Sequence, residues 1–354
     1  MGVARQQELD VVRGTAILLV LAFHFRLSLG APLLDALLQP VFAIGWAGVD
    51  LFFVLSGFLV GRMILIEAAS PPGFDRRRFF VRRAWRLWPV SGLYCAVLLA
   101  VCGAGAWSMV WPVLLHVQNF TGDAPSHLWS LAVEEHFYLG AAVLIPILYR
   151  CGGYRRVERM LIGIMAMCLL LRLGGVLAGV PMLHLQWQTQ YRIDAPAFGV
   201  LMASVSLRRP IGFAALARAR ARWCAVAVSG AVLLGMAGDG AVRHGVGFTI
   251  AYLSAGAFLL ALYGARMPVG LRWPAGRIAA LGLIAYPVYI WHASIGMIVR
   301  AASLPSPLAF VGAGVVAIAV GAALHALVER PILRWSRRAK PPEMPPNAIA
   351  NHSL

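Results

Sequence analysis

The chain is too apolar to be a soluble domain, because 60% of its 354 residues are hydrophobic and only 13% are charged, whereas soluble domains carry about 25% charged residues. Its formal net charge is +17, but the basic residues lie in clusters between apolar stretches, which argues against a nucleic-acid-binding domain. The five cysteines lie in or beside apolar runs without metal-ligand spacing, so we expect neither a metal site nor a disulfide framework.

Apolar runs of about 17–22 residues recur from end to end, which is the length needed to cross a hydrocarbon core about 30 Å thick. The sequence therefore predicts an all-α polytopic transmembrane helical bundle. We expect ten spans, at residues 9–28, 45–66, 89–106, 129–149, 160–180, 191–208, 223–238, 247–264, 277–299 and 307–328. Residues 1–338 are expected to form one transmembrane domain, and the proline-rich residues 339–354 a disordered cytoplasmic tail.

The basic residues indicate how the bundle is oriented. Six arginines lie between Arg76 and Arg86, ahead of the third span, and further clusters follow the fourth, sixth, eighth and tenth spans. The segments on the opposite side hold little beyond Arg243 and Arg300. Because basic residues concentrate on the cytoplasmic side of membrane proteins, we expect an even number of spans with both termini in the cytoplasm.

The first expected span carries two ionisable residues in the stretch "DVVRGTAILLVLAFHF", Arg13 and His24. They are 11 residues apart, which places both on one face of a helix and separates them by about 16 Å along its axis. Taken alone, Arg13 can be an anchor that reaches the cytoplasmic surface, and His24 a hydrogen-bonded core residue. Their shared face favours a functional role for both.

Further ionisable residues occur in the outer halves of other expected spans, where such groups are costly and usually face a protein interior or a wet cavity. They are Asp50, Glu134, Glu135, Arg192, Asp194 and His292. Glu134 and Glu135 point about 100° apart, so we expect one to face the interior and the other to be paired or tilted outward. The simpler interpretations are that Arg192 and Asp194 form an ion pair with each other, and that His292 belongs to an aromatic belt at the membrane interface. Together with His24, these groups favour one polar chamber in the outer half of the bundle.

Two further patterns concern packing and anion binding. Ser56 and Gly57 are small residues that would let a neighbouring helix approach the second span closely. Arg83 and Arg86 are three residues apart and share a helical face on the cytoplasmic side. Most of the arginines around them are explained by attraction to anionic lipid, but this pair also suits phosphate, because guanidinium groups bind phosphate oxygens through two parallel hydrogen bonds.

The pattern as a whole resembles the acyltransferase-3 family of integral membrane acyltransferases. The matching segments are the Arg13 and His24 stripe, "GVDLFFVLSGFL" with Asp50, Arg83 and Arg86 ahead of Trp88-Pro89, "HLWSLAVEEHFYL" with Glu134 and Glu135, "RIDAPAFG" with Arg192 and Asp194, "YPVYIWH" with His292, and "VERPI" with Glu329. The resemblance covers nearly the whole chain in order. We expect a stand-alone form without the periplasmic esterase-like domain that some relatives carry, which leaves the acceptor open among exopolysaccharide, lipopolysaccharide, peptidoglycan, glycolipid and macrolide.

The resemblance implies a multi-pass protein of the bacterial inner membrane that moves an acyl group, commonly acetyl, from cytoplasmic acyl-CoA to a hydroxyl of a carbohydrate or glycoconjugate. Acetyl-CoA would be a co-substrate, with no bound cofactor and with membrane lipid as surroundings. We expect His24 to act as general base, aided by Asp50 or Glu134, and Arg13, Arg83, Arg86, Arg192, Asp194 and His292 to bind substrate. Direct and two-step transfer both stay open, as does the oligomeric state. The alternative function is a proton-coupled transporter or flippase, which also holds charges within its spans.

Overall fold

The computed structural model describes residues 7–25, 31–302 and 306–338, and these ranges hold helices and turns without a strand. The expected tail, residues 339–354, lies outside the described residues. The helices are α1 (Gln7–His24), α2 (Pro32–Ile44), α3 (Gly48–Ala69), α4 (Arg76–Cys102), α5 (Trp107–Leu114), α6 (Trp129–Leu177), α7 (Met182–Trp187), α8 (Thr189–Arg192), α9 (Asp194–Arg208), α10 (Pro210–Arg218), α11 (Arg220–Met236), α12 (Phe248–Leu262), α13 (Val269–Leu283), α14 (Ala285–Ala301), α15 (Ser306–Leu324) and α16 (Arg330–Arg338). Short 3₁₀ helices at Gly45–Ala47, Ala104–Ala106 and Ser126–Leu128 and π-helical segments at Arg243–Gly247 and His325–Glu329 join some of them.

Helices are the expected outcome for these apolar runs, because a chain in lipid must satisfy its backbone hydrogen bonds within the segment. Local signals set where the helices end. The side chain of Asp75 accepts a hydrogen bond from the backbone N–H of Arg78 at 2.9 Å and so caps the start of α4. Helix α6 is kinked at Gly152 and Gly153, and Gly153 adopts φ +60°, a conformation that glycine tolerates best. The kink falls between residues 129–149 and 160–180, which the sequence predicts as two separate spans.

By length and composition, five of the described helical segments can cross a membrane: Pro32–Ala69, Arg76–Cys102, Ser126–Leu177, Arg243–Leu262 and Val311–Ser336. The number rises to seven if the two bent pairs, α9 with α10 and α13 with α14, each count as one span. The chain is thus a multi-pass helical membrane protein, while ten crossings and two cytoplasmic termini remain predictions. Helix occurs in every expected range, but the expected span 277–299 is broken at Ile284, where α13 and α14 meet at 76°.

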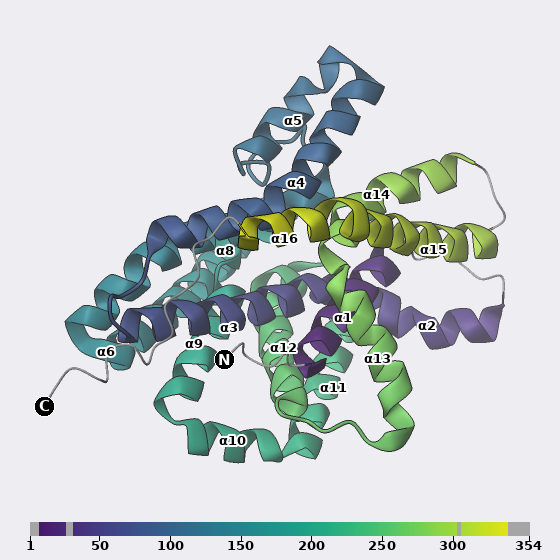
Figure 1. Cartoon of the computed structure of the whole chain (residues 1–354). Helices are drawn as coiled ribbons and strands as arrows, with labels where there is room; N and C mark the ends of the chain where they lie inside the picture. The colour runs from purple at the N-terminus through teal and green to yellow at the C-terminus, as the bar shows by residue number, and fades with distance from the viewer. Residues whose placement is uncertain (1–6, 26–30, 303–305, 339–354) are drawn as a thin grey trace, which may run out of the picture.

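The bundle is organised around α1, which contacts α3, α12, α13 and α14 (Figure 1). Helix α3 packs against α9, and a methyl group on Gly57 would overlap the backbone carbonyl of Pro196. The expectation that Gly57 lets a neighbouring helix approach closely is therefore confirmed. Ser56 was expected to serve the same purpose, but its side chain instead lies in a cavity described below.

Helix α4, which carries the arginine cluster, is held to the bundle from two directions. The C-terminal helix α16 runs alongside it (Figure 1), and the rings of Trp85 and Trp335 meet edge to face with centroids 5.1 Å apart. On the side of α14, the hydroxyl of Tyr286 donates to the backbone carbonyl of Leu87 at 2.7 Å. These contacts fix the height and rotation of the helix segment on which Arg83 and Arg86 lie.

Candidate active site

Three histidine rings meet at one end of α1. The ring of His24 packs edge to face against that of His292 on α14, with centroids 4.6 Å apart. The ring of His127, in the turn that precedes α6, lies 5.2 Å from His292 on another side. His127 and His292 are buried, at 7% and 0% exposure. The structure thus brings His24 and His292 together, as the shared chamber predicted, and adds a third histidine that we did not single out from the sequence.

Backbone carbonyls orient all three rings. Nδ1 of His24 lies 2.9 Å from the carbonyl oxygen of Val20, Nδ1 of His292 lies 2.6 Å from that of Tyr289, and Nε2 of His127 lies 2.9 Å from that of Ile290. Because a carbonyl oxygen only accepts, each of these nitrogens carries the proton of the neutral ring. In neutral His24 the basic nitrogen is therefore Nε2. The expected orienting partner of His24 was a carboxylate, Asp50 or Glu134, but this hydrogen bond comes from the backbone of its own helix.

His24 faces a small cavity, named here the histidine cavity. Its lining includes His24, His127, Trp129, Arg192, Phe248 and Tyr289. The cavity is lined by one arginine, two histidines and several aromatic rings, so it is suited to a polar reacting group flanked by apolar surface. Of the groups expected to share one polar chamber, His24 and Arg192 line this cavity and Glu134 lines another, while Asp50, Asp194 and His292 line neither.

The buried charges near the histidine cavity form two ion pairs. Nη2 of Arg192 donates to Oδ1 of Asp50 at 2.9 Å, and Nη1 of Arg172 donates to Oδ2 of Asp194 at 2.7 Å. All four side chains are at most 1% exposed. The mutual pair of Arg192 with Asp194, considered from the sequence, is therefore not the arrangement observed. Arg172 was missed, although an arginine inside the apolar run "LLLRLGG" is itself a signal of a buried charged site.

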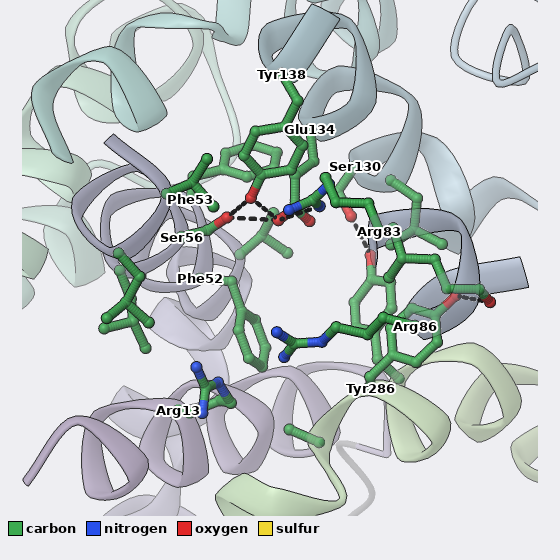
Figure 2. A pocket seen from close by; sticks show the side chains of 18 residues that line it. Arg13, Phe52, Phe53, Ser56, Arg83, Arg86, Ser130, Glu134, Tyr138 and Tyr286 are labelled. Atoms are coloured by element: carbon green, nitrogen blue, oxygen red, sulfur yellow. Dashed lines mark hydrogen bonds and ion pairs between the residues drawn. The ribbon is translucent and has the colours of Figure 1, made fainter. Parts of the chain in front are cut away.

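A second cavity, named here the arginine cavity, lies between α1, α3, α4, α6 and α14 (Figure 2). Its lining includes Arg13, Ser56, Arg83, Arg86, Glu134 and Tyr286. Figure 2 shows the guanidinium groups of Arg13 and Arg86 reaching into this cavity from α1 and α4. Arg13 also pairs with Asp10 at 2.9 Å on its own helix. The cavity volume is about 130 Å³, below the usual range for a whole cofactor-sized ligand, so the cavity can take only part of one.

Arg83 and Arg86 differ in their contacts although they share a helical face. Nη2 of Arg83 donates to Oε1 of Glu135 at 3.1 Å and lies 3.8 Å from Oε1 of Glu134. The Arg83 guanidinium also lies 3.4 Å above the centre of the Tyr138 ring. Arg83 is therefore already neutralised by protein carboxylates, whereas the guanidinium of Arg86 reaches into the cavity. Arg13 lines the same cavity although it pairs with Asp10, and the use of Arg83 with Arg86 as a phosphate-binding pair stays a prediction.

Glu134 and Glu135 are used differently, as their 100° separation suggested. Glu134 lines the arginine cavity, while Glu135 does not and forms the shorter contact with Arg83. Oε1 of Glu134 accepts hydrogen bonds from the hydroxyls of Ser56, at 2.5 Å, and Tyr138. This carboxylate therefore organises a polar wall of the arginine cavity and does not contribute to the histidine cavity.

The two cavities are adjacent, because Val49 and Tyr289 line both of them. The hydroxyl of Tyr289 donates to the backbone carbonyl of His127 at 2.5 Å and accepts from Ser130 at 2.6 Å. The tyrosine therefore joins the wall of one cavity to the histidine cluster of the other. Within the described residues, no group of three or more His, Cys, Asp or Glu side chains is placed to hold a metal ion.

Comparisons with known proteins identify the family. The acyltransferase domain of the acyltransferase-3 family matches residues 6–326. A candidate membrane-bound transacylase of Komagataeibacter xylinus, BcsY, is 28% identical over 314 residues, which are 81% of this chain and 72% of that protein. The peptidoglycan O-acetyltransferase OatA of Listeria monocytogenes is 28% identical over 162 residues, which are 37% of this chain and 22% of its own.

The O-acetyltransferase OatA of Staphylococcus aureus is 29% identical over 160 residues, covering 40% of this chain and 24% of its own. The match thus spans less than a quarter of each of these two O-acetyltransferases. No solved structure matches the chain. Since the family match extends over nearly the whole sequence, this membrane protein belongs to the acyltransferase-3 family and is an acyltransferase.

Proposed function

We propose that the protein moves an acetyl group from cytoplasmic acetyl-CoA to a hydroxyl of a carbohydrate or glycoconjugate at the cell envelope, with His24 as general base. The observation that carries this proposal is the pair of adjacent cavities, one with two inward-reaching arginines and the other with an oriented histidine. Relatives named O-acetyltransferases support the acetyl group as the one transferred.

The arginine cavity suits the coenzyme end of the donor. Coenzyme A carries anionic phosphates at one end and the thioester at the far end of its pantetheine arm. Arg13 and Arg86 supply guanidinium groups from two different helices, which lets them hold phosphate oxygens from two sides. Arg83 supports this arrangement indirectly, because its contacts with Glu135 and Tyr138 fix α4 against α6.

The histidine cavity suits the reacting end of the donor and the acceptor. His24 lies 11 residues after Arg13 on α1, about 16 Å further along the axis, so an extended arm anchored near Arg13 has to travel that distance. With its proton on Nδ1, His24 presents Nε2 as the nitrogen that can remove a proton from the attacking hydroxyl. The ring of His292 packs edge to face against that of His24 and supports its orientation.

The remaining charged groups have supporting roles in this proposal. Asp50 neutralises Arg192 in the wall of the histidine cavity, and Asp194 neutralises Arg172 behind it. Both termini, and therefore the arginine cavity, would face the cytoplasm, where acetyl-CoA is made. The histidine cavity would then lie nearer the outer face of the bacterial inner membrane, where envelope acceptors are found.

A transfer assay tests the proposal directly. Purified protein in lipid vesicles receives acetyl-CoA labelled in the acetyl group, together with membrane extracts that contain the envelope glycans. We expect label to move to a base-labile ester on a glycan. Labelled donor that stays intact with every acceptor fraction, in a preparation shown to be folded, would contradict the proposal and favour the transporter alternative. Mass spectrometry of surface glycans from a deletion strain identifies the acceptor.

A further inference from the structure

Two buried arginines near the histidine cavity, Arg172 and Arg192, differ in how many of their guanidinium nitrogens are hydrogen-bonded. All three guanidinium nitrogens of Arg172 are hydrogen-bonded: Nε donates to the carbonyl of Gly245 at 3.1 Å, Nη1 to that of Tyr191 at 2.5 Å and to Asp194 at 2.7 Å, and Nη2 to Thr249 at 2.7 Å. Arg172 is 0% exposed and its donors are used within the protein. This is the pattern of an arginine that holds a fold together.

Arg192 is just as buried, at 1% exposure, but only one of its nitrogens has a hydrogen-bond acceptor within the described part of the chain. Nη2 donates to Asp50, while Nε and Nη1 are buried without an acceptor. A buried charged donor without a partner is costly, and native proteins keep such groups where function requires them. Arg192 therefore has donor capacity that the fold itself does not use.

The position of Arg192 is fixed although those donors are unused. Asp50 holds one edge of the guanidinium, and the ring of Phe248 lies beneath it, with the central carbon 3.6 Å from the ring centre. The ring of Trp129 lies 5.3 Å away on another side. Such cation–π contacts hold the guanidinium plane without consuming its N–H groups. The side chain lines the histidine cavity together with His24.

We propose that Nη1 and Nε of Arg192 donate to the carbonyl oxygen of the donor thioester and stabilise the oxyanion that forms on it. This inference rests on the proposed acyl transfer. The acceptor oxygen bonds to the thioester carbon while its proton passes to Nε2 of His24, and the carbonyl electron pair moves onto oxygen beside Arg192. The carbonyl then re-forms, the carbon–sulfur bond breaks, and the coenzyme A thiolate takes the proton back from His24. Arg192 stays protonated throughout.

The chemistry favours this role over simple charge balance. Asp50 already neutralises Arg192, so the site is close to neutral before reaction and does not strongly favour an anionic ground state. The hydrogen bonds from Nε and Nη1 of Arg192 become strongest when negative charge develops on the carbonyl oxygen. Because these N–H groups are already held in place, they need no reorganisation at that moment. Arg192 should therefore act on the rate of transfer more than on the affinity for either substrate.

The test uses Arg192→Lys in the full-length protein in lipid vesicles, with Arg172→Lys as the matched control. Lysine keeps the charge and the pairing with Asp50 but lacks the planar fork. We expect kcat to fall about 100- to 1,000-fold, the usual effect of losing an oxyanion donor, while KM for acetyl-CoA and for the acceptor change little. Arg172→Lys should mainly lower the midpoint of thermal unfolding, because it removes bonds that the fold uses. Added guanidinium should partly restore the rate of Arg192→Ala.

Several outcomes would overturn the inference. Arg192→Lys with near-normal kcat would show that the donors are not used in the rate-limiting transfer. A raised acceptor KM with unchanged kcat would assign Arg192 to acceptor binding instead. A fall in thermal stability as large as that of Arg172→Lys, without guanidinium rescue of Arg192→Ala, would make Arg192 structural. Failure of the wild-type protein itself to transfer acetyl groups would refute the proposed function, which is a different result from a selective loss in the variants.

Discussion

Arg83 and Arg86 lie on the same helix, but we predict that replacing Arg86 weakens acetyl-CoA binding, whereas replacing Arg83 mainly lowers the stability of the fold. Arg86 reaches into the arginine cavity and is exposed to solvent, so its contact with a phosphate should be at the lower end of the range for charge-assisted hydrogen bonds, about 1.5 kcal/mol. Arg86→Ala should therefore weaken acetyl-CoA binding about tenfold. Adding Arg13→Ala removes a second such contact, and the double variant should bind about 100-fold more weakly.

Arg83→Ala should behave differently, because Arg83 is only 15% exposed and faces two carboxylates. Removing one partner of a buried ion pair costs about 3–5 kcal/mol, and we expect the lower end of that range since Glu134 and Glu135 are partly accessible. The assay is equilibrium binding of labelled acetyl-CoA in vesicles, alongside thermal unfolding. Arg77→Ala, which removes an exposed arginine of the same helix that does not line the cavity, is the control for lost charge.

The reasoning would be refuted if Arg86→Ala left the affinity for acetyl-CoA unchanged while Arg83→Ala lowered it in a stably folded protein. That result would mean that Arg83 contacts the phosphate and that Arg86 interacts with anionic lipid.

Three further predictions follow from the packing and the cavities. Gly57→Ala should destabilise the protein by about 1–3 kcal/mol because its methyl group overlaps the carbonyl of Pro196, whereas Gly140→Ala, with open space beside it, should not destabilise it; equal thermal midpoints would contradict this packing. Tyr289→Phe should lower kcat with little change in acetyl-CoA affinity, since the hydroxyl bonded to the His127 carbonyl belongs to the wall between the cavities; normal turnover would show that this bond is dispensable. Reporter fusions at Gly2 and Leu354 should be active only in the cytoplasm, and periplasmic activity at either end would refute the orientation.

Much of the site could be predicted from spacing and depth. The 3.6-residue period placed Arg13 and His24 on one face of α1, and similar depth placed His292 near His24, which the 4.6 Å ring separation confirms. These predictions succeeded because helix geometry and the cost of buried charge depend only on local sequence.

Pairings between helices could not be predicted in the same way. Arg192 and Asp194 are neighbours in sequence, yet each pairs with a residue far along the chain, Asp50 and Arg172. Arg192 ends α8 and Asp194 begins α9, and residues two apart in helical backbone do not face each other. The partner of a buried charge depends on which helix packs opposite, and the sequence alone does not encode that at the level of single positions.

Two other differences come from backbone breaks. His127 was overlooked because it precedes the expected span at 129–149. It lies in the short 3₁₀ helix Ser126–Leu128, which directs its ring to the histidine cluster. The continuous span expected at 277–299 is broken at Ile284, between Gly282 and Pro287, two residue types that disfavour a continuous helix. The expected span rested on hydropathy, which measures how apolar a segment is and does not weigh such helix breakers.

His24→Gln tests the central claim, that His24 is the base for acyl transfer from acetyl-CoA, more directly than any other variant. Glutamine keeps polarity and part of the hydrogen bonding but cannot accept the proton, so we expect kcat to fall about 100- to 10,000-fold. Expression, membrane insertion and thermal stability should match those of His184→Gln, which changes an exposed histidine far from the cluster in sequence. Near-normal turnover of His24→Gln would contradict the account, and His292 would then be the next candidate for the base.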